Sequence, residues 1–380
     1  MKIIVKIDIN KDAANWWHAC NKVSYGIDWK QRITKILQNK VVNKTEKQAY
    51  SFLVPYLKKL YKREKIEEIQ KQLQKMFNSR AHEIFRRMVR VTGKKIYRKS
   101  FTIFLTTFSR APYDPKRGFV WMPIQRGERS MNTFTHELLH FQTLYYYEKL
   151  ILKKLNENEK ENLKEALTVI LNVEFKDLLT WQPDYGYPIH KFLREDLFWF
   201  WKKHRNFNRL ISHGISVYPK YAKTIRYLGF GIYTSSCPEF LLDKVKRLKS
   251  TRISNAYVYK VLRAIKEEFD PRLHTTTTTN DFKTSRFISI KEILNKRQRS
   301  CGSLATVVAS ALRNFGIPAK LIDGKFIKNN PKMRHAWNEI WVNDKWVSFD
   351  VMRKDFSLTQ YHIKLGEYVD WEELEDNKDG

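Results

Sequence analysis

The chain has 380 residues, of which 42% are hydrophobic and 14% are aromatic. A chain of this size and composition can bury two or three hydrophobic cores, which excludes an intrinsically disordered protein. The formal net charge of +31 suggests nucleic-acid binding, because lysine and arginine neutralise phosphates. About half of this charge lies between Lys30 and Lys99, where 21 Lys or Arg residues accompany five Glu residues. Because they are spread around amphipathic helical patterns, we favour solvated helix faces and keep nucleic-acid binding as an alternative.

The cysteines and the hydrophobic runs bear on cellular location. Cys20, Cys237 and Cys301 are an odd number without a C-x-x-C pair, which is typical of a reducing cytoplasm rather than of a disulfide framework. The opening residues alternate apolar and charged side chains and show no signal-peptide pattern. The most hydrophobic run, Leu197–Trp201, is flanked by charges and is far shorter than the ~18 residues of a membrane span. We therefore expect a cytoplasmic protein without a membrane-spanning segment.

The first two-thirds of the chain is predicted to be mostly helical, with a small sheet. A strand opens the chain, and basic helices follow up to about residue 100. Residues 100–108 and 118–124 are predicted strands, joined by a loop rich in Pro, Asp and Arg. Helices are expected over 132–147 and 158–173, within a helical region that continues to about residue 248.

The stretch "THELLH" contains the pattern H-E-x-x-H, formed by His136, Glu137 and His140. His136 and His140 lie one helical turn apart on the same face, so both can ligate a zinc ion. Apart from the two histidines, Glu137 is the only acidic or basic residue between Ser130 and Tyr147. An unpaired buried carboxylate costs several kcal/mol, and taking a proton from zinc-bound water would explain its presence there. We therefore predict a Zn²⁺ site with Glu137 as its catalytic base.

A catalytic zinc needs a third protein ligand. Here the sequence resembles the gluzincin metallopeptidases, because the next helix contains "KEALTVIL", similar to the third-ligand helix of that family. The resemblance implies Glu165 as the third ligand, with Glu161 and Glu174 as reserves. It also implies that residues 100–108 form an edge strand that aligns an extended peptide. The sequence departs from the family at Gln142, where an apolar residue is usual, and at Val169, where an aspartate often supports the histidines. Three further histidines are candidate oxyanion helpers: His190, His204 and His213.

The C-terminal third contains a second set of candidate catalytic residues. A helix is predicted at about 254–269, and Thr275–Thr279 is predicted to be an extended loop or strand. The apolar spacing after Cys301 predicts a helix that begins at this cysteine, where the helix dipole and free N–H groups favour a thiolate and a developing oxyanion. Two alternating strands, separated by a turn at Asn343–Asp344, follow further on. In that register His335 and Asp350 project from one face, within hydrogen-bonding reach.

These residues resemble the transglutaminase-like superfamily of cysteine enzymes. The matching features are Cys301-Gly302 opening a helix that ends "NFGIPAKLI", then His335-Ala336-Trp337, then "KWVSFD" ending in Asp350. The resemblance implies a Cys-His-Asp triad of Cys301, His335 and Asp350 that performs acyl transfer on amides. The chain has Arg299 where family members often have glycine, and this bears on the oxyanion geometry.

The resulting prediction is an α+β protein with two domains. Residues 1–245 would form a zincin-like, helix-rich domain with a small sheet, and residues 250–365 a transglutaminase-like domain with a helix and an antiparallel sheet. Residues 366–380 would form an acidic tail. The predicted function is hydrolysis or acyl transfer on peptide or protein amides, with Zn²⁺ at the first site and no cofactor at the second. Two alternatives stay open: a single catalytic domain whose neighbour binds substrate, and a basic nucleic-acid-binding protein. The sequence leaves the oligomeric state undecided.

Overall fold

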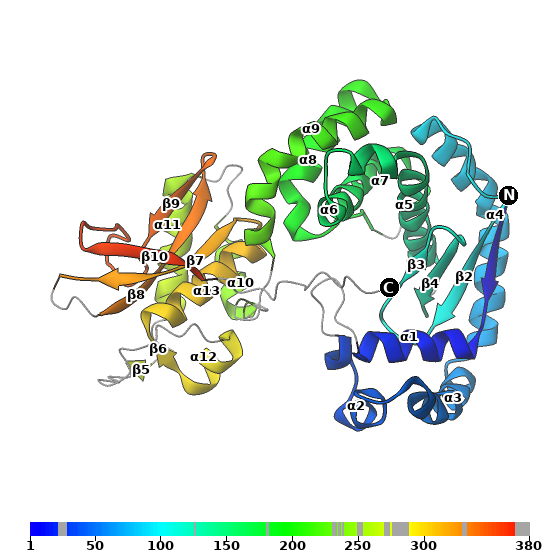
Figure 1. Ribbon diagram of the computed structural model, residues 1–380, viewed down its shortest axis with the longest axis horizontal. Coiled ribbons are helices and arrows are strands. Elements are labelled where there is room, and N and C mark those ends of the chain that lie inside the picture. The colour runs from blue at the N-terminus through cyan, green and yellow to red at the C-terminus, as the bar shows by residue number, and fades with distance from the viewer. Residues whose placement is uncertain are drawn as a thin grey trace. The chain divides into compact units, whose positions relative to one another are not determined.

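A computed structural model describes residues 1–21, 29–124, 127–179, 182–229, 234, 237, 239–248, 254–269, 274–275, 289–328 and 333–368. The chain divides into two compact units, Met1–Pro219 and Lys220–Gly380. Both units combine helices with a four-stranded sheet, as expected of an α+β protein (Figure 1). In the described residues no helix is long and apolar enough to cross a membrane.

The first unit contains a sheet of order β1-β2-β4-β3, formed by Lys2–Lys6, Ser100–Thr106, Phe119–Pro123 and Tyr113–Asp114 respectively. β1, β2 and β4 run parallel, and β3 runs antiparallel to β4. The predicted strands are present, but the edge-strand interpretation of residues 100–108 is wrong. β2 pairs on both sides, with β1 and with β4, because the opening strand of the chain occupies the position that was expected to be free.

Most of the other described residues of the first unit are helical. Those before β2 are α1 Ile9–Asn21, η1 Trp29–Arg32, α2 Lys35–Val41, α3 Glu46–Arg63 and α4 Ile66–Thr92. Those after β4 are α5 Glu128–Leu152, α6 Glu157–Leu167, η2 Thr168–Ile170, α7 Leu171–Glu174, η3 Pro188–His190, α8 Lys191–His204 and α9 Phe207–Ile225, whose residues from Lys220 onward are assigned to the second unit. The Lys and Arg residues of α3 lie on its exposed face, while Ala49, Leu53 and Leu57 are buried.

α5 carries the H-E-x-x-H pattern and is longer than predicted. It is buried along most of its length, and Phe134 and Phe141 pack against Phe101 of β2. α4 packs against β1 and α5. This packing fixes the helix face that presents His136 and His140.

The second unit begins before the predicted boundary at 245–250. Residues 220–245 belong to it because Cys237, Leu241 and Val245 lie in its hydrophobic core. Buried Arg313 also donates hydrogen bonds to the Gly229 carbonyl and the Thr234 hydroxyl. The described helices that lie wholly in the second unit are η4 Arg226–Leu228, α10 Glu239–Lys246, α11 Asn255–Phe269, α12 Ile290–Lys296 and α13 Cys301–Asn314.

The main sheet of the second unit is antiparallel with order β10-β7-β8-β9 (Figure 1). The strands are β7 Ala319–Phe326, β8 Arg334–Val342, β9 Lys345–Phe349 and β10 His362–Tyr368. Two short strands, β5 His274–Thr275 and β6 Gln298–Arg299, pair separately. Most of the predicted Thr275–Thr279 segment and the tail beyond residue 368 lie outside the described residues, whereas residues 366–368 end β10 rather than starting a tail.

The predicted hairpin register is confirmed. Val342 pairs with Lys345 and Asn338 with Phe349, and the two turn residues between the strands both have positive φ angles, 50° and 61°. Asparagine and aspartate tolerate this left-handed conformation, which a two-residue hairpin turn requires. The turn therefore places Asp350 directly after β9, diagonal to His335 on β8.

Buried polar contacts hold α13 on the sheet. The Asn338 side-chain amide on β8 donates to the Ala305 carbonyl of α13 and to the Lys320 carbonyl of β7, both at 3.0 Å. Asn338 is fully buried, so losing either acceptor would leave a costly unpaired donor. This bridge fixes the start of α13 relative to β8.

Gly324 on β7 is required by close packing rather than by its backbone angles. A Cβ atom there would lie 2.3 Å from the Trp337 ring and 2.5 Å from the Ile363 carbonyl oxygen. We expect Gly324→Ala to lower the unfolding free energy of the second unit by about 1–3 kcal/mol, because it overpacks a buried ring between two strands. Gly366→Ala is the matched control, since a Cβ there meets nothing within 4 Å. Urea unfolding that gives equal losses for both variants would contradict this account.

Candidate active sites in the two units

The second unit brings Cys301, His335 and Asp350 together as predicted. Cys301 is the first residue of α13, preceded by Ser300, whose side chain accepts a hydrogen bond from the Ser303 backbone N–H at 3.1 Å. This cap leaves the first-turn N–H groups beside the thiol free to stabilise negative charge. Cys301 is partly exposed, whereas Cys20 and Cys237 are buried.

His335 connects the cysteine to the carboxylate. Its Nε2 lies 2.9 Å from Asp350 Oδ2, and its side chain also hydrogen-bonds Cys301. Because Nε2 faces the carboxylate, Nδ1 is the nitrogen left for the thiol. Burial lowers the pKa of His335, but the hydrogen bonds to Asp350 and Cys301 outweigh it and raise the pKa to about 9. The ring is therefore charged at neutral pH and suited to pair with a thiolate.

Asp350 is buried and held from several sides. Its Oδ1 accepts the Met352 backbone N–H at 2.9 Å, and its Oδ2 also lies 3.0 Å from His362 Nε2. Burial raises the pKa of Asp350, but these hydrogen bonds and the charge of His335 lower it below its ordinary value. Lys266 of α11 donates to the Val351 carbonyl at 2.8 Å, which fixes the turn after the carboxylate. Sequence reasoning missed His362, which lies on β10, separated from β8 by β7.

The first unit brings together the predicted metal ligands. His140 Nε2 lies 3.2 Å from Glu165 Oε1, and His136 Nε2 lies 3.5 Å from Glu165 Oε2. Two ligand atoms bound tetrahedrally at ~2.0–2.1 Å from zinc are separated by about 3.3 Å, so these spacings suit a zinc ion. Both ring nitrogens of His140 are buried without a hydrogen-bond partner in the described structure, although Nε2 is close to Glu165. The two imidazoles and the carboxylate therefore fit the group that the sequence predicts.

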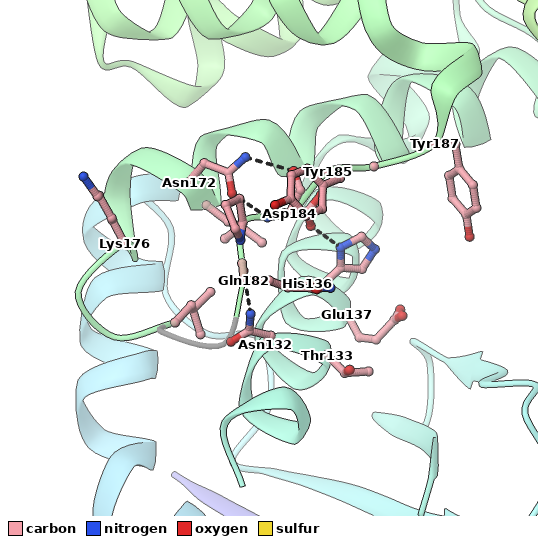
Figure 2. Close-up of a pocket in the computed structure, with 14 residues that line it drawn as sticks. Asn132, Thr133, His136, Glu137, Asn172, Lys176, Gln182, Asp184, Tyr185 and Tyr187 are labelled. Atoms are coloured by element: carbon pink, nitrogen blue, oxygen red, sulfur yellow. Dashed lines mark hydrogen bonds and ion pairs between the residues drawn. The ribbon is translucent and has the colours of Figure 1, made fainter. Parts of the chain in front are cut away.

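Asp184 contacts His136, one of the predicted zinc ligands. Figure 2 shows its carboxylate directed at the His136 ring, with Oδ2 at 2.6 Å from Nδ1. Burial raises the pKa of Asp184, but the hydrogen bond and charge of His136 and the charge of Arg194 lower it to about 2. A carboxylate on the far ring nitrogen fixes Nε2 as the free ligand atom. Asp184 lies in a loop without periodicity, so its contact with His136 could not be read from the sequence.

Glu137 lines the pocket beside His136, whereas the two reserve ligands, Glu161 and Glu174, are bound to other side chains. Burial raises the pKa of Glu137 to about 7, and its Oε2 is buried without a hydrogen-bond partner among the described residues. Glu137 lines a pocket of about 800 Å³ together with His136 and Asp184 (Figure 2). Glu161 pairs instead with Lys164 at 2.7 Å, and Glu174 with Trp201 and Arg205 at 3.0 and 2.8 Å.

Three histidines were considered as oxyanion helpers, and of these His190 lies near the cluster of His136, His140 and Glu165. Burial has the largest effect on the pKa of His190 and lowers it to about 4. The charge of Glu165 raises this pKa, and the charge of Arg194 lowers it. His190 Nε2 lies 2.9 Å from Asn162 Oδ1. His213 instead pairs with Asp196 at 2.6 Å and stacks on Phe200, and His204 packs against the same ring.

Comparison with known proteins bears on the second unit. Residues 243–351 match the transglutaminase-like superfamily. This transglutaminase-like segment contains Cys301, His335 and Asp350 but none of the proposed zinc ligands, so the zinc site rests on geometry alone. No curated protein matches the chain.

Two chains among the solved structures match, and one of them is the crystal structure of a proposed cysteine protease from Cytophaga hutchinsonii. The two share 22% sequence identity, with a TM-score of 0.30, over 38% of this chain and 47% of the other. The match thus spans about half of that protein. The assignment of the transglutaminase-like segment rests on the family match and on the fold described above.

The raised pKa of His335 predicts a pH dependence of stability. Its proton stabilises the fold fully below the ordinary pKa of 6.5, and this contribution is lost as pH rises through about 9. Between these values the unfolding free energy of the wild type should fall by on the order of 2 kcal/mol more than that of His335→Gln. Urea unfolding of the second unit measures this difference, and parallel pH profiles would contradict it.

Cysteine reactivity gives a second prediction. Burial raises the pKa of the Cys237 thiol to about 12, so little thiolate forms there, whereas Cys301 is partly exposed beside a charged imidazole. Near neutral pH, iodoacetamide should alkylate Cys301 at least about tenfold faster than Cys237 in the folded protein. Peptide mapping by mass spectrometry measures both rates, and equal rates would refute an activated thiol.

Proposed function

We propose that the second unit is a cysteine enzyme that transfers the acyl group of a peptide or protein amide. The supporting observation is the hydrogen-bonded series Cys301, His335 and Asp350, with the cysteine at the start of α13. The match to the transglutaminase-like superfamily supports the same class of chemistry.

In the proposed reaction each group has one role. Cys301 Sγ attacks the amide carbon, while the first-turn N–H groups of α13 stabilise the developing oxyanion. His335 then gives its proton to the leaving amine, the C–N bond breaks and a thioester remains on Cys301. Water or a second amine attacks the thioester and returns the proton to the Cys301–His335 pair, which releases an acid or a new amide. Asp350 orients the ring of His335 throughout.

A peptide amide library with and without an added primary amine tests this proposal. Cys301→Ala and His335→Gln should each lower kcat/KM by at least about 1,000-fold, because each removes a group that acts in the transition state. Cys237→Ser is the control and should keep wild-type turnover. Retained turnover in Cys301→Ala would overturn the proposal.

We also propose a second function, zinc-dependent hydrolysis of peptide amides by the first unit. The supporting observation is the cluster of His136, His140 and Glu165, because its spacing and the two buried ring nitrogens of His140 without a hydrogen-bond partner among the described residues suit Zn²⁺. Zinc there would supply Lewis-acid chemistry and acidify a bound water. Glu137, with its pKa raised to about 7, is suited to accept a proton near neutral pH. Asp184 would hold His136 in the orientation that leaves Nε2 for the metal.

Metal content tests this second proposal. Native mass spectrometry should find one zinc ion per wild-type chain and markedly less in Glu165→Ala, because a ligand is lost. Glu174→Ala is the matched control, since that carboxylate contacts Arg205 and Trp201 outside the cluster. A wild-type chain that binds no zinc would rule out the site, whereas undiminished zinc in Glu165→Ala would rule out only the third ligand.

A further inference from the structure

A second histidine shares the carboxylate of the proposed cysteine site. His362, at the start of β10, places its Nε2 3.0 Å from Asp350 Oδ2, the same oxygen that His335 contacts at 2.9 Å. The His362 side chain is fully buried, between the rings of Phe326 and Trp337, with centroid separations of 4.9 and 5.7 Å. Its ring is therefore held in one orientation.

The surroundings of His362 determine which nitrogen carries the proton. The Thr359 backbone N–H donates to His362 Nδ1 at 3.0 Å, and a backbone N–H can only donate. The Thr359 carbonyl lies farther from Nδ1, at 3.3 Å, and it already accepts the His362 backbone N–H at 3.0 Å. Nδ1 is therefore the acceptor, and the Thr359 hydroxyl, 3.1 Å away, can also donate to it, so the neutral ring bears its proton on Nε2 and donates it to Asp350.

The hydrogen bonds to Asp350 act together. The carboxylate accepts from His335 and His362 at Oδ2 and from the Met352 N–H at Oδ1. Donors on both oxygens stabilise the charged form and prevent rotation of the carboxylate. If Asp350 rotated or became protonated, the His335 ring would lose the partner that directs its Nδ1 to Cys301.

We infer that His362 is a positioning residue of the cysteine site, which keeps Asp350 ionised and aimed at His335. This inference rests on the proposed function of the second unit. The site is then a series of four groups, in which His362 acts on the thiol only through Asp350 and His335.

The same groups could instead form a metal site, because ligand atoms of His335, Asp350 and His362 lie within 4.8 Å of one another. Nε2 of His362 already carries the proton that it donates to Asp350, and Nδ1 accepts from Thr359. A cation at Nε2 would have to displace that proton, and moving it to Nδ1 would oppose the Thr359 N–H. The hydrogen-bonded arrangement therefore favours a positioning role.

Nitrogen NMR of the wild-type protein at mildly alkaline pH tests the proton position without any substrate. We expect His362 to show a proton on Nε2 alone, and His335, with its pKa of about 9, to be protonated on both nitrogens. Added zinc should leave the His362 signals unchanged. A proton on Nδ1 of His362, or a zinc-dependent shift of its Nε2, would overturn the inference even if the cysteine enzyme were active.

Two substitutions test the consequence for catalysis. His362→Phe keeps an aromatic ring but removes the donor, and it should lower kcat about 10–100-fold with little change in KM. His362→Gln can place an N–H near the position of Nε2 and should restore kcat to within about fivefold of the wild type. In His362→Phe the acid limb of the Cys301 alkylation rate should move upward by about half a pH unit, because Asp350 becomes easier to protonate.

Val342→Ala is the control for a merely structural effect, since this buried residue lies at the far end of β8 from His335. It should lower the melting temperature without moving the acid limb of alkylation. An unmoved acid limb in His362→Phe, or no rescue by His362→Gln in a folded protein, would overturn the inference. Loss of the proposed function is recognised separately, by turnover that survives Cys301→Ala.

Discussion

The second unit depends on one buried carboxylate. Asp350 is 2% exposed, and it is stabilised only because two imidazoles and a backbone N–H donate to it. Without those donors the burial of its charge would cost several kcal/mol. The hairpin turn and the Lys266 contact to the following turn place the carboxylate near His335 and the Met352 N–H, and the Asn338 bridge fixes the start of α13 relative to β8. The reactivity proposed for Cys301 follows from that arrangement, since the carboxylate orients His335 and keeps it charged.

The first unit uses the same physical device around another histidine. The Asp184 carboxylate is hydrogen-bonded to His136 Nδ1. It also forms an ion pair with Arg194 at 2.9 Å and accepts a hydrogen bond from the Thr168 hydroxyl at 3.1 Å. In both units an aspartate whose side chain is at most 14% exposed contacts one imidazole nitrogen, so that the second nitrogen is left for the proposed chemistry. The difference lies in the group that this second nitrogen faces: a thiol in one unit and the proposed zinc site in the other.

The features that local pattern determines were predictable from sequence. The hairpin register, the helix beginning at Cys301 and the spacing of His136 and His140 follow from periods of two and 3.6 residues and were all found. Asp184 and His362 were missed because each reaches its partner through long-range packing, across 48 residues to His136 and 12 residues to Asp350. The edge assignment of β2 failed for a related reason, since a parallel partner from the opening of the chain cannot be inferred from the pattern of β2 alone. The zinc ligands and the catalytic roles remain predictions.

The central claim is that Cys301 forms a covalent bond with the acyl group of an amide substrate. Intact-protein mass spectrometry, after acid quenching during turnover of a peptide amide or ester, tests it most directly. The account predicts an added mass equal to the acyl group, mapped to Cys301 and absent from Cys301→Ala. Turnover by the second unit without an adduct on Cys301 in any quenched sample, together with undiminished turnover in Cys301→Ala, would contradict it.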